Sequence, residues 1–436
     1  MKDWRLNRLI CWLLLPAICC AASPASEPSV LTLENAVRIA LENQPVIRAA
    51  QANINFSEAV LRQAESNFYP NINMTANGSH IDGYFVFNPS FPARKQAYNS
   101  YSTTVQLQQI LFDFNKTFPR VSAGKYGLEA TQSDYQSTRD AVIMNVQLAY
   151  YQIIRASRIV RVTETIVNQA EEHLKQAKAF NRAGKASQFD ITRAEVDLAN
   201  SNVNLLSAQN TEQLARVQLK NAMGVQEATD FTIPDTFRIE DFTVSLDSVK
   251  QIALANRPEI HAGRARINQN RAVAKAVKSQ HLPNLLAVGS YQWNGFEFPL
   301  QGRWNVGLTL NIPVFQGFNI SAQVEQAEAN LDASEADFET LKQQIMLLVE
   351  QYYLQLDEAG KNIKATGVLV KQAEENLRLA QTRYISGLGS PIEITDALVV
   401  LGNARITNVQ AVYDYNVALA QLRRAMGIPL VRYADN

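Results

Sequence analysis

The sequence predicts a mostly α-helical protein with a smaller β part, built from long coiled-coil hairpins in tandem repeat. Two stretches, Arg120–Ala183 and Gln316–Gly389, contain no proline. Each is long enough for one helix of about 60 residues, on the order of 90 Å. Short segments in which polar and apolar residues alternate precede each stretch, and this pattern is typical of strands.

The tandem repeat is visible in the order of matching residues. The segment that begins at Leu33 matches the segment that begins at Leu246, at an offset of 213 positions. Later matches, ending with Ala-Met-Gly at Ala222 and at Ala425, keep an offset of 203. The change places a ten-residue insertion in the first copy, between Pro70 and Phe112. We predict repeat 1 at 31–225, a linker at 226–243, repeat 2 at 244–428 and a C-terminal tail at 429–436.

Each repeat opens with a helix and ends with long helices, predicted at 120–223 and 316–426. The last helix of repeat 2 carries an unbroken heptad seam, in which alternate positions are mostly alanine. The seam consists of Ile394, Ala397, Leu401, Ala404, Asn408, Ala411, Tyr415, Ala418, Leu422 and Ala425. Helices of a soluble bundle would show the same pattern, so the seams indicate a coiled coil and no particular function.

One β-hairpin is predicted in each repeat, at about 70–112 and about 283–314. The strands are about ten residues long, which is enough to cross an outer membrane when tilted, and each has a polar face suited to a lumen. Aromatic residues such as Tyr69, Tyr101 and Trp304 lie near their ends, as in interfacial girdles. A half-buried soluble sheet alternates too. The loops outside would span 79–100 and 294–302.

The first residues have the layout of a secretory signal peptide. Lys2, Arg5 and Arg8 precede an apolar run from Leu9 to Cys20, and small residues follow. We predict a signal peptide at 1–22. Since all three cysteines lie in this region, the mature chain would have neither a disulfide framework nor a thiolate metal site. Acylation at Cys19 or Cys20 stays an open alternative.

The charge balance argues against nucleic acid as a partner. The chain has 41 basic and 41 acidic residues, and they form no basic stripe. After the signal, no stretch approaches a transmembrane helix in length and apolar character. An exported chain without such a helix is periplasmic, secreted or inserted as a β-barrel.

A membrane location would require several copies of the chain. Four strands cannot close a barrel, and an open sheet edge is not tolerated in lipid. Two chains would give eight strands, whose interior is filled by side chains. Three chains would share a 12-stranded transmembrane β-barrel in the outer-membrane lipid, and the long helices would continue from it as an α-barrel. The sequence therefore favours a homotrimer.

The whole arrangement resembles the TolC-like family of outer-membrane efflux and secretion channels. The resemblance is carried by the opening segment Leu33-Glu-x-Ala-Val-x-x-Ala-Leu-x-Asn-x-Pro45, the two hairpins and the Ala-Met-Gly endings, and it covers nearly the whole mature chain. It implies a trimeric exit duct in the bacterial outer membrane that extends into the periplasm. It also implies two partners, a periplasmic adaptor protein and an inner-membrane transporter.

The resemblance also implies a periplasmic constriction where the two long hairpins turn, at Gly184-Lys-Ala-Ser187 and Gly387-Leu-Gly-Ser390. Tyr384, Glu393 and Asp396 fall on the family's gate tyrosine and its two ring-forming acids, and Asp190 falls on the acid that this tyrosine contacts when closed. Capping of the helix N-termini is an alternative role for Glu393 and Asp190. The family's arginine after the turn glycine is Gly389 here, so the closed-state link is expected to be weaker or differently made.

Other classes of function find little support. Gly184-Lys-Ala-Ser187 is not a phosphate loop, because Ala179 stands in place of its first glycine and Ala186 interrupts the Lys-Ser pair. The four histidines are scattered without metal-ligand spacing. We therefore predict no enzyme, cofactor or metal site. A periplasmic coiled-coil scaffold or adaptor without a barrel is the alternative to a channel.

Overall fold

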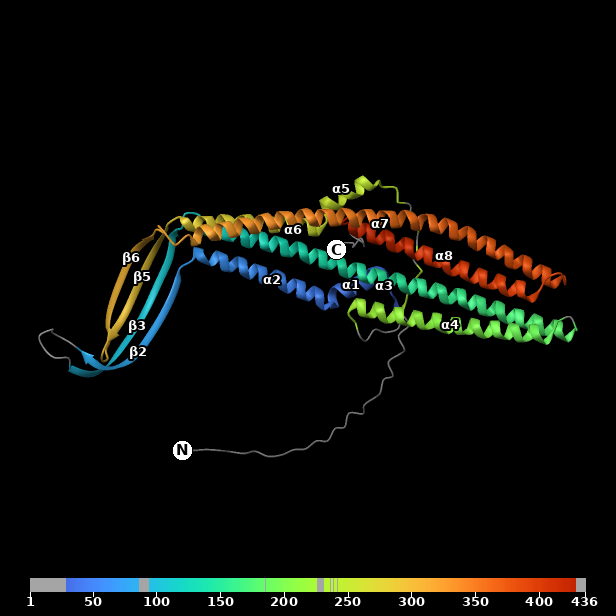
Figure 1. Cartoon of the computed structure of the whole chain (residues 1–436). Coiled ribbons are helices and arrows are strands. Elements are labelled where there is room, and N and C mark those ends of the chain that lie inside the picture. Colours follow the sequence, from blue (N-terminus) through green and yellow to red (C-terminus); the bar gives the residue numbers. More distant parts are fainter. Residues whose placement is uncertain are drawn as a thin grey trace, which may run out of the picture.

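The computed structural model describes residues 29–85, 94–184, 186–225, 231–235, 237, 239–240 and 242–428. The predicted signal peptide at 1–22 and the C-terminal tail at 429–436 lie outside the described residues. The molecule is a long rod of helices with a β-sheet at one end (Figure 1). The predicted class, mostly α-helical with a smaller β part, is confirmed.

The two repeats place the same elements in the same order. The helices are α1 (Leu33–Asn43), α2 (Pro45–Glu65), α3 (Thr117–Arg182), α4 (Gln188–Met223), α5 (Leu246–Asn256), α6 (Pro258–Lys278), α7 (Asn319–Ile385) and α8 (Pro391–Ala425). The strands are β1 (Ser29–Val30), β2 (Asn71–Phe85), β3 (Arg94–Phe112), β4 (Phe231–Thr232), β5 (Asn284–Gly295) and β6 (Gln301–Asn311). The longest helices, α3 and α7, contain 66 and 67 residues.

Local sequence explains where these helices begin. Pro45 and Pro258 occupy the first positions of α2 and α6, where a missing N–H costs nothing, and the residue before each proline is extended. Helix α3 begins earlier than the predicted Arg120, because Asp113 Oδ2 accepts a hydrogen bond from Thr117 N at 2.6 Å. Pro119 is tolerated there because it lies in the first turn.

Helix α7 begins later than predicted, at Asn319 instead of Gln316. Gly317 and Phe318 just before it have positive φ angles of 58° and 64°. A left-handed backbone at these residues cannot continue a right-handed helix, so the chain makes its turn there.

Strands β2, β3, β5 and β6 form one antiparallel sheet in that order. The first hairpin is longer, with strands of 15 and 19 residues against 12 and 11 in the second, so the insertion in repeat 1 lengthens the strands. The predicted loop at 79–100 was therefore wrong in extent. Ser79–Phe85 and Arg94–Ser100 pair as strand, and only 86–93, outside the described residues, lie between them.

One face of the sheet's outer strand β6 is apolar and exposed on the protomer. Trp304, Val306 and Leu308 are exposed by 75%, 75% and 68%. Asn305 and Thr309 alternate with them and point to the opposite face, because successive side chains of a strand alternate. Alternation predicted this strand correctly, with Trp304–Ile312 expected and Gln301–Asn311 found.

The long helices lie side by side as one layer away from the sheet. Helix α3 packs against α4 and α8, and α8 packs against α7 (Figure 1). The predicted seam of α8 is confirmed, since every member is buried except Asn408. Asn408 is half-buried, and its Nδ2 donates to Thr366 Oγ1 at 3.1 Å on α7.

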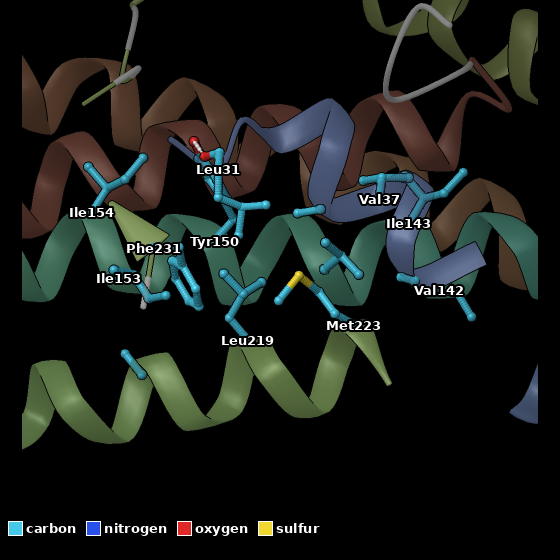
Figure 2. Packing of buried hydrophobic residues seen from close by; sticks show 14 of the residues in the cluster. Leu31, Val37, Val142, Ile143, Tyr150, Ile153, Ile154, Leu219, Met223 and Phe231 are labelled. Carbon is cyan, nitrogen blue, oxygen red and sulfur yellow. Dashed lines mark hydrogen bonds between the residues drawn. The ribbon is translucent and has the colours of Figure 1, made fainter. Parts of the chain in front are cut away.

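The apolar core of repeat 1 lies midway along the rod, where the short elements wrap the long helices. In Figure 2, Leu219, Met223 and Phe231 fill the space between α3 and α4. Tyr150 of α3 is fully buried, and its hydroxyl donates to the carbonyl of Leu31 at 3.1 Å. This core fixes α1 and the paired strands β1 and β4 against the hairpin.

None of the helices in the described part of the chain combines the length and apolar character needed to cross a bilayer.

Candidate pore constriction at the helix-hairpin tips

The two long hairpins turn at the same end of the rod, opposite the sheet (Figure 1). Gly184 and Gly387 each begin the turn with φ angles of 73° and 74°. Glycine adopts this left-handed conformation without a Cβ penalty, so both helices can end sharply there. The turns bring the four residues predicted for the constriction to one region of the molecule.

Asp190 lies in the first turn of α4 and acts as a helix cap. Its Oδ2 accepts hydrogen bonds from Ser187 N at 2.8 Å and from Ser187 Oγ at 2.9 Å. The Ser187 side chain accepts in return from Asp190 N, which completes a capping box. The capping role considered for Asp190 is thus present in the protomer.

Glu393 has the same position in α8, and it does more than cap. Its Oε1 accepts from Ser390 N at 3.4 Å, within a capping box. Its Oε2 lies 3.1 Å from Nε of Arg383, in the last turn of α7. Nη2 of Arg383 also donates to the carbonyl of Leu388 at 3.2 Å. One guanidinium therefore ties the end of α7 to the turn and to the start of α8.

Gly389 cannot be replaced by a larger residue without moving this turn. A Cβ at Gly389 would lie 2.9 Å from Tyr384 N and 3.0 Å from Arg383 Cβ. The close approach puts the Gly389 amide within 3.0 Å of the Arg383 carbonyl, to which it donates. Arg383 of α7 therefore makes the hydrogen bonds that hold the turn, and this contact does not require a side chain at position 389.

Tyr384 is buried between the two hairpins, with 8% of its surface exposed. Its ring centroid lies 5.3 Å from that of Phe180 and 6.0 Å from that of His173, both on α3. Burial and the nearby Asp190 carboxylate raise the pKa of Tyr384. No described residue hydrogen-bonds its buried Oη. Asp190 and Tyr384 are thus close enough to interact electrostatically, but they are not joined.

Asp396 lies one turn beyond Glu393 on α8 and is exposed. The ion pairs among the described residues include Glu393 but not Asp396. Residues three apart on a helix are neighbours, so the two carboxylates share one side of α8. In the protomer they form a small anionic patch at the rim of the tip.

A hydrogen bond joins the two hairpins near the tips. Thr395 Oγ1 of α8 donates to Asp197 Oδ2 of α4 at 2.9 Å. His173 of α3 is buried beside it, and its Nδ1 finds no hydrogen-bond partner within the described chain. Burial lowers the pKa of His173, while the Asp197 and Asp190 carboxylates oppose this effect.

Sequence reasoning proposed Asp190, Tyr384, Glu393 and Asp396 for the site, and it did not single out Arg383, His173 or the pair Asp197–Thr395. The contact of Arg383 with Glu393 crosses a turn, so no helical spacing reveals it. The histidine was set aside as a metal ligand, and its burial against Tyr384 depends on how two hairpins pack. Among the described residues, no cluster of three or more side chains could hold a metal ion.

Comparison with known proteins identifies the family. The sequence pattern of the family described as "Outer membrane efflux protein" matches residues 36–225 and 249–428, one match in each repeat. The chain belongs to the outer membrane efflux protein family. It is accordingly an exit duct of the bacterial outer membrane that extends into the periplasm, for efflux or type I secretion. The predicted resemblance and location are confirmed, and the scaffold alternative is not.

Relatives within this outer membrane efflux protein family are distant but cover most of the chain. The outer membrane protein TolC of Vibrio cholerae is 24% identical over 418 residues, which covers 92% of this chain and 92% of that protein. The alkaline protease secretion protein AprF of Pseudomonas aeruginosa is 23% identical over 341 residues, covering 76% and 70%. The family consists of channel proteins that work with efflux or secretion systems.

The fold is similar to solved channels of the same kind. The open state of the MtrE outer membrane channel of Neisseria gonorrhoeae superimposes with a TM-score of 0.79, at 20% sequence identity. The match covers 93% of this chain and 91% of that channel. The CmeC channel of Campylobacter jejuni gives the same TM-score at 18% identity. Both comparisons confirm the arrangement of helical rod and β-domain.

Proposed function

We propose that three copies of this chain form one continuous duct, with a 12-stranded barrel in the outer-membrane lipid and a tunnel of long helices below it. The duct receives substrates from an inner-membrane transporter through a periplasmic adaptor protein and releases them outside. A signal peptide at 1–22 directs the chain to the periplasm, and repeats at 31–225 and 244–428 build the protomer. N-terminal sequencing of the mature protein tests the cleavage site.

The main support for a trimer is that the sheet of one protomer has two unpaired edges. In the described structure, β2 pairs only with β3, and β6 pairs only with β5. Unpaired strand edges cannot lie in hydrocarbon, since every backbone N–H and C=O there needs a partner. Pairing of β2 with β6 of a neighbouring copy satisfies both edges, and three copies leave a lumen that two copies do not.

The helical layer has matching unpartnered edges. Helix α4, at one side of the layer, exposes Val203 and Val217 by 63% and 62%. Helix α7, at the other side, exposes Leu347 and Leu354 by 59% each. Apolar side chains in rows on both outer helices are typical of surfaces that become buried in an assembly. Contact of α4 with α7 of the next copy would cover both rows.

The trimer is tested by the native mass of the membrane-extracted protein and by cysteine cross-linking. Since the sequence places all cysteines at positions 11, 19 and 20, paired cysteines can be introduced into a thiol-free mature chain. One cysteine is placed on β2 at Thr75 and a second is moved along β6 from Asn305 to Thr309. We expect a mass of three chains and a covalent trimer for one register. A monomer by both measurements would contradict the proposal.

We further propose that Asp190, Tyr384, Glu393 and Asp396 form the periplasmic constriction of this duct. The support is their position at the hairpin tips and the two carboxylates on one side of α8. Three copies would place six carboxylates around one mouth, which gives a strong local field that favours cations. Arg383 neutralises part of the Glu393 charge, so Asp396 contributes the larger share.

Ion selectivity in planar bilayers tests this constriction. The double variant Glu393→Ala with Asp396→Ala should lose most of the preference for cations, measured as the reversal potential across a salt gradient. The exposed acid Glu171 on α3 provides the matched control, because Glu171→Ala removes a charge away from the turns. Unchanged selectivity in the double variant, with the trimer intact, would place the constriction elsewhere.

A further inference from the structure

A cavity of about 490 Å³ lies between α3, α4 and α8, and the hydrogen-bonded residues Asp197 and Thr395 form part of its wall. Its size falls within the roughly 300–1,000 Å³ that small-molecule sites occupy. Two of its walls, α3 and α4, come from repeat 1, and the third, α8, comes from repeat 2. It is therefore a site that both repeats build together.

The cavity is apolar over much of its surface. Ile159 and Ile166 of α3 line it on one side, and Leu398 and Ile406 of α8 line it on another. Gly402 of α8 also lines it, where a Cβ would come within 2.7 Å of Ile166 Cδ1. An apolar body can bury against these side chains and so be removed from water, which favours binding.

The α4 wall is polar and carries a negative charge. Asp197, Asn200 and Asn204 line the cavity along α4 at spacings of three and four, so they lie on one face of the helix. The Asp197 carboxylate accepts from Thr395, but none of the ion pairs among the described residues includes it. Arg193, one turn earlier on α4, is the nearest candidate partner in sequence, yet the two are not paired.

His173 completes the cavity from α3. It is 94% buried, and its Nδ1 makes no hydrogen bond within the described structure. Buried polar atoms nearly always have a partner, so an orphaned ring nitrogen in a cavity wall points to an absent one. The charged and titratable groups that face His173 are Asp190 and Asp197 of α4 and Tyr384 of α7. Burial lowers the pKa of the imidazole, which favours the neutral form over a cation that would repel an ammonium group.

We propose that this cavity binds a small amphipathic amine, with its ammonium group at Asp197 and its apolar body against α3 and α8. The Asn200 and Asn204 side-chain carbonyls accept the remaining ammonium hydrogens, and His173 Nδ1 serves as a further polar contact. A bound amine bridges α4 and α8 and holds the two hairpins together. This last consequence rests on the proposed constriction, whereas the binding itself does not.

Fluorescence titration tests the site on the full-length protein in lipid nanodiscs. The probe is dansylcadaverine, a primary amine on an aromatic body, and dansylglycine is its anionic counterpart with the same fluorophore. We expect saturable binding of the amine, with one site per chain, and no saturation with the acid. Asp197→Asn keeps the shape of the side chain and should weaken the amine about tenfold, through loss of a charged hydrogen bond.

Two further variants make the result specific. Glu171→Gln removes an exposed charge from α3 outside the cavity and should bind like the wild type. Ser207→Trp, at an exposed position on the cavity wall, should fill the space and abolish binding. Wild-type affinity in both Asp197→Asn and Ser207→Trp would overturn the proposal. Since no conductance is measured, failure here is distinct from failure of the trimer or the constriction.

Discussion

The guanidinium of Arg383 lies 3.1 Å from the carboxylate of Glu393, so the last turn of α7 is joined to the first turn of α8. The same guanidinium reaches the carbonyl of Leu388 between them. This ion pair is exposed, and it would remain intact only as long as the turn keeps its shape. It is the feature at the tips most directly open to test.

Arg383→Ala should loosen the tip of the second hairpin and raise the open probability of the duct. Exposed ion pairs contribute roughly 0.2–1 kcal/mol, so we expect a change of up to about fivefold for each protomer. Single-channel recording measures it at low salt, and the difference from wild type should shrink near 1 M salt, where the Debye length is about 3 Å. Arg378→Ala, which breaks a 2.6 Å pair within α7, is the control. An equal effect of both variants would argue against a special role for Arg383.

Gly389→Ala should destabilise the turn, because its Cβ would press on the backbone at Tyr384 N, 2.9 Å away. A backbone shift of this kind costs about 1–3 kcal/mol. Limited proteolysis should cleave the variant faster at the tip. Gly367→Ala is the control, since nothing lies within 4 Å of the added Cβ in the middle of α7. There the change should stabilise the helix by about 0.5–1 kcal/mol. Equal cleavage of both variants would contradict the close approach.

Much of this fold could be predicted because periodic patterns record local geometry. The α8 seam and the four strands follow from spacings within one element, and the doubling of the chain follows from matching residues at a fixed offset. The start of α3 was missed because Asp113, which accepts from Thr117 N, lies outside the helix. The start of α7 was missed because Phe318 has a positive φ, which is uncommon for phenylalanine and is not predicted by its residue type. The ends of β2 and β3 could not be predicted from alternation alone, because the two strands pair through the inserted residues.

The site could be predicted only in part, for a physical reason. Glu393 was proposed as a site residue through the family resemblance, and the capping pattern of Ser390, Pro391 and Glu393 showed only that it begins a helix. The partners that define its environment come from other elements. Arg383 meets it across a turn, and the burial of Tyr384 by His173 depends on the packing of α3 against the second hairpin. Such contacts are set by tertiary structure and leave no spacing in the sequence.

Tyr384→Phe should leave the closed conformation and the thermal stability nearly unchanged. The hydroxyl is buried without a hydrogen-bond partner in the described structure, so its removal takes away an unsatisfied polar group. Tyr384→Ala, in contrast, removes the ring that packs on Phe180 and should cost about 3–5 kcal/mol. The melting temperature and the single-channel conductance of both variants, compared with those of the wild type, test this prediction. Frequent opening of Tyr384→Phe alone would mean that the hydroxyl gains a partner in the assembled duct.

The last prediction concerns pH and His173. Burial lowers the pKa of this imidazole in the folded chain below its ordinary value of 6.5. Between the two pKa values the unfolded chain binds more protons than the folded one, so the free energy of unfolding falls as the pH drops below about 6.5. His173→Gln removes this group and should show a smaller decrease in Tm between about pH 7.5 and about pH 5. The exposed His261→Gln is the matched control and should keep the wild-type difference. If His173→Gln lost as much stability in acid as the wild type, the acid sensitivity would not come from the burial of His173.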